Sequence, residues 1–479
     1  MKSKTWILLS LIVVFSLVVC SACTKNPTQA APTKGAAPTK AAATNTPAAA
    51  KNEPVTITWF VGFGTGTDPG QIEIHEKIVQ EFNDAHDDIE LVLLTVPHDE
   101  HISKFSTMLA ADTPPDLVMP IGIAGIAEFF DEWADIQPLI DTDKYDMSDF
   151  YGPTVDLHTY PDKVVGLPLG VFPTVIFYNE DIFDTAGLDY PPHKFGQSDW
   201  TLNALVDLSK ALTLDENGND ANSPDFDWEK TVQWGWDGLS WASFGEYPPK
   251  FGGLAIPVSQ DFTKAMVNSD AWVKSAQWMA DNVWERHIRA TGEQAGVFDD
   301  AGGDPFGSGM VAMWECHSWM SYAFEDWTDS FNWNMAAVPA GPNGDIAAAI
   351  HADTFAIPKS SKHQKEAWEV AKWLAQPDIL NMLSQNWGGI PARKSLADVW
   401  RKDMGDKYPH QDFQVFFDAI DYLDAPNHEA WTPEYNKVQD ALNTAIDLIM
   451  TGENLNVQQV MDAANDEIQG YLDEYWKNH

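Results

Sequence analysis

The chain has 479 residues, more than a single hydrophobic core usually supports, so at least two lobes or domains are expected. Apolar residues make up 44% and charged residues 21%, which is typical of a globular protein and excludes a largely disordered one. With 29 Lys and Arg against 71 Asp and Glu, the net charge is −42, and such a surface repels phosphate backbones and disfavours a nucleic-acid partner.

The amino terminus is typical of an export signal. Lys2 and Lys4 precede an apolar segment at residues 6–19. As a helix this segment would rise about 21 Å, short of the roughly 30 Å hydrocarbon core of a membrane. Residues 20–23 (CSAC) resemble the bacterial lipobox, in which a small-residue pair precedes a lipid-modified Cys. We expect a lipoprotein signal peptide at residues 1–22 and a lipid on Cys23; an ordinary secretory signal with an incidental Cys is the alternative.

Residues 23–54 are expected to form a flexible, lipid-anchored linker. From residue 24 on they are almost entirely Ala, Thr, Pro and Lys, with no aromatic or large aliphatic side chain to bury. The four Lys of the linker, against one Glu, favour an anionic membrane surface. Beyond Cys23 the mature chain contains only Cys316, which excludes an intramolecular disulfide.

The folded part begins with an alternation of strands and helices. Residues 55–60 (VTITWF) predict a strand, a glycine-rich turn follows at 62–66, and apolar residues at helical spacing predict a helix to about residue 85. Residues 91–94 predict a short buried strand, so the order indicates parallel α/β layers. The glycine-rich turn lacks the spacing of nucleotide-binding loops, which disfavours nucleotide binding.

A second α/β region follows residues 166–169. Residues 175–178 predict a strand, and Thr201 is expected to cap a helix with Leu205, Leu208 and Leu212 on one face. Residues 214–227 form an acidic loop with Asp at position 215 and Asn at positions 217 and 219. This loop lacks the Gly and Glu of an EF-hand, so a solvated turn is favoured over calcium, although a structural calcium stays open.

The last third of the chain continues the same pattern. Strands are predicted at residues 333–338 and 350–357, and Ser361-x-x-Gln364 predicts a capping box for the next helix. The last 45 residues are helical in pattern, with Val438, Leu442, Ala445 and Ile449 on one stripe. The 21 Trp outnumber the 12 Tyr; we expect about two-thirds of the Trp in core or hinge packing and a few at a carbohydrate site.

Five segments in order carry a resemblance to a known family. They are LAADTPPD at 109–116, GLP at 166–168 with FYNEDIFDTAGL at 177–188, FGSGMVAMW at 306–314, VPAGP at 338–342 with FAIPKSSK at 355–362, and GIPAR at 389–393. Together they resemble family 1 extracellular solute-binding proteins, the maltose-binding-protein-like receptors of bacterial ABC sugar importers. The resemblance covers nearly the whole mature chain.

The resemblance implies an α/β, two-lobed, periplasmic-binding-protein-like fold of type II, with the ligand cleft between lobes joined by crossover segments. The amino-terminal lobe is expected at 55–168 and 348–420, and the carboxyl-terminal lobe at 174–345 and 422–479. Such a cleft is a favoured ligand site, and a hinge lets binding close it. The implied function is capture of a mono- or oligosaccharide and its delivery to the permease subunits of an ABC importer.

The resemblance also places candidate ligand-binding residues in the cleft. They supply rings for the apolar faces of a sugar and polar groups for its hydroxyls. The candidates are Phe63, Phe172, Trp314, Glu315, His317, Trp319, His351 and Asp353, with Trp387, Arg393 and Trp431 as further neighbours. Trp319 is the expected stacking platform. Asp116 is expected to be structural, and the apolar segment at 120–122 departs from the polar residue or Trp of sugar-binding relatives.

Other functions remain as alternatives. A polyol, a glycerol-phosphate-type ligand or an amino sugar could take the place of a simple sugar. Glu315, Asp353 and the excess of acidic residues also suit a cationic ligand such as a polyamine. A secreted glycoside hydrolase would need paired carboxylates across a cleft, and no motif singles out such a pair. We expect no catalytic residues, no cofactor and no metal, since no His/Cys pair has ligand spacing. The protein is expected to be a monomer on the outer face of the cell membrane, held there by lipid alone.

Overall fold

The computed structural model describes residues 53–479, apart from residues 161, 239–242, 302–303 and 425–426. The expected signal peptide, Cys23 and the linker up to residue 52 lie outside the described residues. Within the described part, no helix is both long enough and apolar enough to cross a membrane.

One half of the main sheet is built from the amino-terminal strands. β1 (Val55–Val61) lies parallel to β2 (Ile89–Thr95) and β3 (Leu117–Ile121), and β3 pairs antiparallel with β9 (Ile350–Ala356). The strand order is β9-β3-β1-β2. The helices of this half are α1 (Pro69–Ala85), α2 (His101–Ala110), α3 (Ile123–Glu128), α4 (Gln137–Asp143), α5 (Gly152–Asp156), α11 (Gln364–Leu374) and α12 (Pro377–Trp387). The predicted strand–helix–strand alternation is confirmed here.

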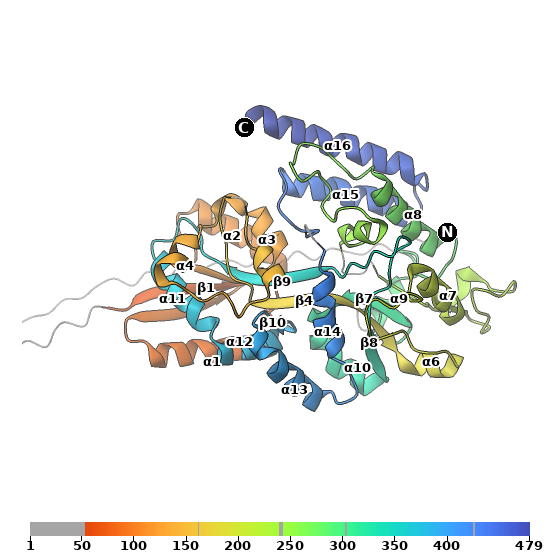
Figure 1. The fold of residues 1–479 in the computed structure, drawn as a ribbon, viewed down its shortest axis with the longest axis horizontal. Coiled ribbons are helices and arrows are strands. Elements are labelled where there is room, and N and C mark those ends of the chain that lie inside the picture. The colour runs from red at the N-terminus through yellow and green to blue at the C-terminus, as the bar shows by residue number, and fades with distance from the viewer. Residues whose placement is uncertain (1–52, 161, 239–242, 302–303, 425–426) are drawn as a thin grey trace, which may run out of the picture. The chain divides into compact units, whose positions relative to one another are not determined.

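The strand β4 (Gly170–Asn179) runs from this half of the sheet into the other (Figure 1). Its first four residues pair with β9, and two of them also pair with β10 (Ile390–Pro391). From Thr174 onward it pairs with β7 (Met313–His317), and from Ile176 with β8 (Trp333–Ala336). All ten residues of β4 are buried. The strand predicted at 175–178 therefore continues without interruption through the expected crossover.

The remaining helices lie against β10, along β4 and around the second half of the sheet. They are α6 (Glu180–Ala186), α7 (Leu202–Leu212), α8 (Asp270–Trp284), α9 (Gly296–Asp300), α10 (Phe324–Ser330), α13 (Ala397–Lys407), α14 (Gln414–Ala419), α15 (Tyr435–Met450) and α16 (Val457–Asn478), with a small hairpin of β5 (Leu214–Asp215) and β6 (Thr231–Gln233). As predicted, the Thr201 hydroxyl caps α7 by accepting from the Ala204 N–H. The predicted apolar stripe of α15 is buried against its neighbours.

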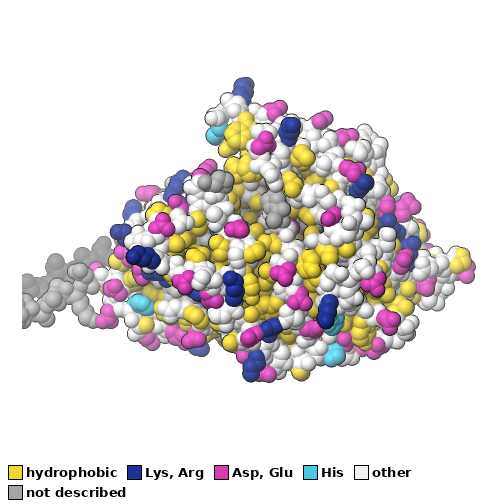
Figure 2. All heavy atoms as spheres, viewed as in Figure 1, with side chains coloured by type: hydrophobic (Ala, Val, Ile, Leu, Met, Phe, Trp, Pro, Cys, Tyr) yellow, Lys and Arg dark blue, Asp and Glu magenta, His cyan; other side chains and the backbone are white. Residues whose placement is uncertain are grey.

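Tryptophan fills much of the interior. Among the described residues, thirteen Trp are buried, in agreement with the expectation that about two-thirds of the 21 serve core or hinge packing. The surface is acidic: in Figure 2, Asp and Glu side chains are spread across the visible face and not gathered in one patch.

The structure contradicts the predicted capping box and adds detail to the predictions for Asp116 and the acidic loop. The capping box at 361–364 is wrong: His363 is the N-cap of α11, and no side chain caps the helix. The Ser361 hydroxyl accepts the His363 N–H at 3.1 Å, in the turn before the helix, and donates to Asp116 Oδ1 at 2.7 Å. Asp116 Oδ2 also accepts from the Thr58 N–H, which confirms its structural role. In the acidic loop, the Asp215 carboxylate accepts backbone N–H groups of Asn217 and Asn219, as expected of a turn.

Candidate ligand-binding pocket

A pocket of about 490 Å³ opens where the two halves of the main sheet meet. It lies beyond the carboxyl ends of β1 and β3, where loops of neighbouring strands separate and leave room for a ligand. It is lined by Phe63, Gly64, Thr65, Thr67, His98, Gly122, Ala124, Gly125, Phe172, Ser243, Trp319, His351, Asp353 and Glu429. Both halves of the sheet therefore contribute to it.

Trp319 supplies the large aromatic ring of the pocket. It follows β7 in the 3-10 helix Ser318–Ala323 and is half-buried. One neighbour, His317, stacks on the indole with ring centroids 4.0 Å apart, while His351 and Phe172 meet it edge-on or tilted at 4.7 and 6.2 Å. These contacts hold the indole in one orientation at the pocket wall, so its position is set before a ligand arrives.

Asp353 supplies an acceptor to the same pocket. Gly64 and Gly122 let the backbone approach its carboxylate closely: a Cβ atom on either glycine would lie 3.0 or 3.2 Å from a carboxylate oxygen. Burial raises the pKa of Asp353 to about 7, partly opposed by His351. No group in the described ranges hydrogen-bonds this carboxylate, so its acceptor capacity is left for a ligand hydroxyl or amine.

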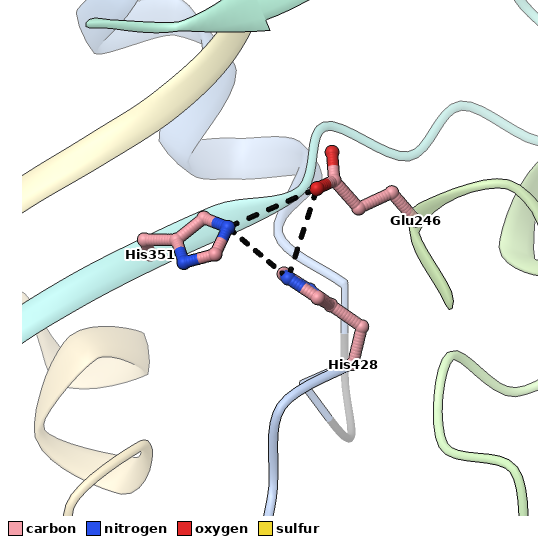
Figure 3. Close-up of side chains that lie close together, drawn as sticks. All are labelled: Glu246, His351 and His428. Carbon is pink, nitrogen blue, oxygen red and sulfur yellow. Dashed lines mark hydrogen bonds and ion pairs between the residues drawn. The ribbon is translucent and has the colours of Figure 1, made fainter. Parts of the chain in front are cut away.

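A buried network of imidazoles and carboxylates lies behind the pocket wall. Glu246 Oε1 lies 3.8 Å from both His351 Nε2 and His428 Nε2 (Figure 3). It also lies 3.1 Å from His317 Nε2. The Ser243 N–H also donates to Glu246 Oε1, at 2.9 Å. Burial opposes ionisation of Glu246, but the imidazoles, His317 first, hold its pKa well below the usual value.

Two further carboxylates complete the network. Glu429 lies 3.0 Å from His351 Nδ1, and Asp424 lies 2.7 Å from His428 Nδ1. Burial alone would lower the pKa of both imidazoles. At His351 the carboxylates of Glu429 and Glu246 outweigh burial and raise the pKa to about 10. At His428 the carboxylate of Asp424 outweighs burial and raises the pKa above its usual value. The network therefore accumulates positive charge between buried carboxylates.

The structure brings five of the predicted residues to the pocket: Phe63, Phe172, Trp319, His351 and Asp353. His317 lies directly behind Trp319 and is fully buried. It contacts Trp319, Glu246 and the Thr174 hydroxyl, not the pocket itself.

The other predicted residues lie elsewhere. Trp314 is fully buried in the core, and Glu315 is buried in an ion pair with Lys250, because alternate residues of β7 face the interior on both sides of the sheet. Trp387 is buried and donates its indole N–H to His75. Arg393 is tied to Asp149 and to backbone.

Trp431 lines a different, apolar pocket of about 420 Å³. Its ring stacks on Phe130 with centroids 5.0 Å apart and meets Phe262 edge-on. Trp431 follows Glu429 closely in sequence, so the two pockets share one connecting segment.

Sequence reasoning missed the residues that come from loops. Ser243, Glu246, His428 and Glu429 reach the pocket or its wall from segments without a recognisable motif. The glycines at 64 and 122 were noted only as parts of a turn and of an apolar segment. Their close approach to Asp353 depends on the pairing of distant strands, which no local pattern reveals.

The comparisons with known proteins agree with this architecture. Residues 68–379 match the family described as bacterial extracellular solute-binding protein. The chain belongs to this family. It is thus a solute-binding protein of the ABC-transporter type, and since the family is one of binding proteins, the expectation that the chain is not an enzyme is supported.

Individual relatives extend over most of the chain. The arabinooligosaccharide-binding protein of Bacillus subtilis (strain 168) is 23% identical over 433 residues, covering 83% of this chain and 89% of the relative. An ABC substrate-binding protein from Listeria monocytogenes in complex with cycloalternan is similar in structure, with a TM-score of 0.69, 20% identity and coverage of 87% and 98%. The cyclic alpha-maltosyl-1,6-maltose binding protein from Arthrobacter globiformis has a TM-score of 0.67 at 18% identity, with coverage of 88% and 100%. The expected mixed α/β periplasmic-binding-protein fold is therefore confirmed.

Proposed function

We propose that this protein captures a sugar, a mono- or oligosaccharide, in the pocket between Trp319 and Asp353 and delivers it to an ABC importer. The observation that carries the proposal is the pairing of a fixed, half-buried indole with a buried carboxylate that has no hydrogen-bond partner in the described part of the chain. A sugar offers an apolar C–H face to the ring and hydroxyl donors to the carboxylate. The ligands named for the relatives are oligosaccharides, which supports the same class.

The proposal includes two lobes with their expected boundaries, 55–168 with 348–420 and 174–345 with 422–479. The change of partners along β4 at Thr174 supports this division, since β9 and β10 lie on one side of it and β7 and β8 on the other. A pocket formed by both sides is suited to closing around a ligand.

The proposal also includes a lipid anchor on Cys23, based on the signal-like residues 1–22 and the Ala/Thr/Pro/Lys linker. Replacing the thiol (Cys23→Ala) removes the acceptor of the lipid, so the variant should leave the membrane fraction for the medium or the soluble extract. Retention of the variant on membranes after a high-salt wash would contradict lipid anchoring.

Binding of a sugar is tested by a thermal-shift panel of mono- and oligosaccharides on the full mature chain. A ligand that binds the folded state raises the melting temperature by mass action, and isothermal titration then gives the affinity. An Asp353→Ala variant should lose most of the shift. A shift with polyamines but not with any sugar would favour the cationic alternative.

The panel also separates short from long ligands. If an oligosaccharide extends from the main pocket towards Trp431, then Trp431→Ala should weaken oligosaccharide binding and leave monosaccharide binding nearly unchanged. Equal losses for both ligands would place Trp431 outside any extended subsite.

A further inference from the structure

Three ligand atoms converge on one point behind the pocket wall. Glu246 Oε1, His351 Nε2 and His428 Nε2 form a triangle with edges of 3.8, 3.8 and 3.1 Å, and Figure 3 shows the three side chains pointing toward one another. We propose that Glu246, His351 and His428 bind a divalent transition-metal ion, with Zn²⁺ the best fit. The site goes beyond sugar capture and does not depend on it.

The size of the triangle suits this ion. A triangle with these edges has its centre about 2.1 Å from each corner, within the range of Zn–N and Zn–O bonds in proteins. Two imidazoles and one carboxylate are a ligand set that zinc accepts, and three protein ligands leave a fourth position for water or a polar group. His351 borders the pocket, so the ion would lie at its wall.

Each imidazole is oriented as a metal ligand usually is. A carboxylate holds Nδ1 of both rings: Glu429 at His351 and Asp424 at His428. Such a carboxylate fixes the Nδ1–H tautomer and directs the Nε2 lone pair at the ion. Glu246 is held in turn by the Ser243 N–H and by His317. The supporting contacts around all three ligands are therefore already in place.

The facing nitrogens require positive charge between them. With Nδ1–H of each ring directed at a carboxylate, both Nε2 atoms carry lone pairs, yet they lie 3.1 Å apart and also face a carboxylate oxygen. Three acceptors at this spacing repel one another unless protons or a metal ion lie between them. One divalent ion satisfies all three at once, and it displaces the protons that otherwise hold the network.

Sequence spacing conceals such a site. Its ligands come from the 3-10 helix Phe244–Glu246, from β9 and from the segment before α15, and they are more than seventy residues apart. The expectation of no metal rested on the absence of close His/Cys pairs. Tertiary pairing brings the three residues together without any local motif.

The experiment uses the full mature chain, stripped with a chelator, without sugar and with ZnCl₂ as the probe. Bound zinc is measured by elemental analysis after gel filtration and by competition with a chromophoric chelator. Wild type should retain one ion per chain. His351→Gln and Glu246→Gln each replace a ligand and should bind zinc more weakly by at least the roughly 10- to 100-fold that loss of a residue supporting a ligand costs. His193→Gln is the matched control, because His193 also has a carboxylate, Asp412, 2.9 Å from Nδ1 but lies outside the cluster.

Failure to retain zinc from micromolar solution, or equal retention by wild type and both cluster variants, would overturn the proposal; the second result would mean binding by the acidic surface. If a variant does not fold, Co²⁺ replaces Zn²⁺ in the wild type. A four-coordinate visible spectrum supports the site, and the weak spectrum of hexa-aqua-like Co²⁺ contradicts it. Because no sugar is present, these results leave the sugar proposal untouched, and a failed sugar panel leaves the metal site untouched.

Discussion

At the scale of single residues, Trp319 is the side chain with most to contribute to ligand binding. Its ring is half-buried and already fixed by His317, so a sugar face gains contact without ordering the indole. We predict that Trp319→Ala weakens sugar binding by about 1–3 kcal/mol, or roughly 5- to 150-fold. Titration calorimetry gives the affinity, and the melting temperature of the ligand-free variant should stay close to that of wild type.

Trp314→Ala is the control for this prediction. Trp314 lies five residues earlier and is fully buried, so its truncation should cost about 3–5 kcal/mol of unfolding free energy with little change in affinity per folded molecule. If Trp319→Ala behaved in this way instead, the indole would be a core residue and not a binding platform.

Glu315 illustrates how an acidic residue near a pocket can be purely structural. It forms a buried ion pair with Lys250, whose ammonium also lies 5.0 Å from the centre of the Tyr247 ring. We predict that Glu315→Ala lowers the unfolding free energy by about 3–5 kcal/mol, because an unpaired Lys is left in the interior. Chemical denaturation measures this loss.

The double variant Lys250→Met with Glu315→Met tests whether the loss in Glu315→Ala comes from the unpaired charge of Lys250, because it removes both charges together. It should recover most of the loss, since apolar side chains of similar length need no partner in the core. A double variant as unstable as the single one would mean that the two residues contribute through something other than their pairing.

For single residues, the sequence predicted which residue types line the pocket better than it predicted which side chains point into it. The segment of β7 and the turn after it was expected to lead towards the ligand; of Trp314, Glu315 and Trp319, only Trp319 lines the pocket. Alternation along a strand buried on both faces carries no hydrophobic signal, because both sets of side chains are enclosed. Direction therefore becomes visible only once the neighbouring strands are placed.

At the scale of elements, the contact between α1 and α12 depends on a neutral histidine. His75 on α1 is fully buried and accepts the indole N–H of Trp387 on α12 at 2.9 Å. Burial lowers the pKa of His75 from 6.5 to about 4. Between these values the unfolded chain binds a proton that the folded chain does not, so stability falls as the pH falls.

We predict that His75 alone lowers the free energy of unfolding of the wild type by roughly 2 kcal/mol when the pH falls from 7.5 to 5. His75→Gln keeps an acceptor for the Trp387 indole and cannot titrate, so its loss on acidification should be smaller by that amount. Urea denaturation at the two pH values measures both. Identical pH dependence in the two proteins would show that His75 does not titrate in the unfolded state as assumed or is not buried.

Element positions were predicted well where a local signal exists. The helical periodicity of residues 74–85, the Thr201 cap and the α15 stripe were all found from sequence. The capping box failed because the helix begins two residues later than the motif implies, so the Ser361 hydroxyl accepts the His363 N–H in the preceding turn. Ser361 also donates to Asp116, which is 245 residues away in the chain, and no local motif reveals such a tertiary contact.

At the scale of the whole molecule, the order of five weak motifs predicted the fold, because each one marks a turn or strand end that the topology requires. The pocket wall was predicted only in part. Glu246, His428 and Glu429 lie on short or irregular segments, which carry no periodic hydrophobic pattern that would place them in a fold from sequence. Their convergence is a consequence of how β4 and β9 tie the two halves of the sheet together.

That arrangement leads to a prediction about closure. β4 and β9 pair with each other and continue into different halves, so a small bend in these strands changes the distance between the loops after β1 and the ring of Trp319. A ligand that contacts both walls favours the closed arrangement by the difference in its affinity for the two states. We predict that a saturating sugar reduces the radius of gyration measured by small-angle X-ray scattering. Trp319→Ala should reach the same radius only at a proportionately higher sugar concentration, because it weakens binding without altering the strands. An unchanged radius at a saturation proven by calorimetry would mean that the sugar enters a pocket whose walls do not move.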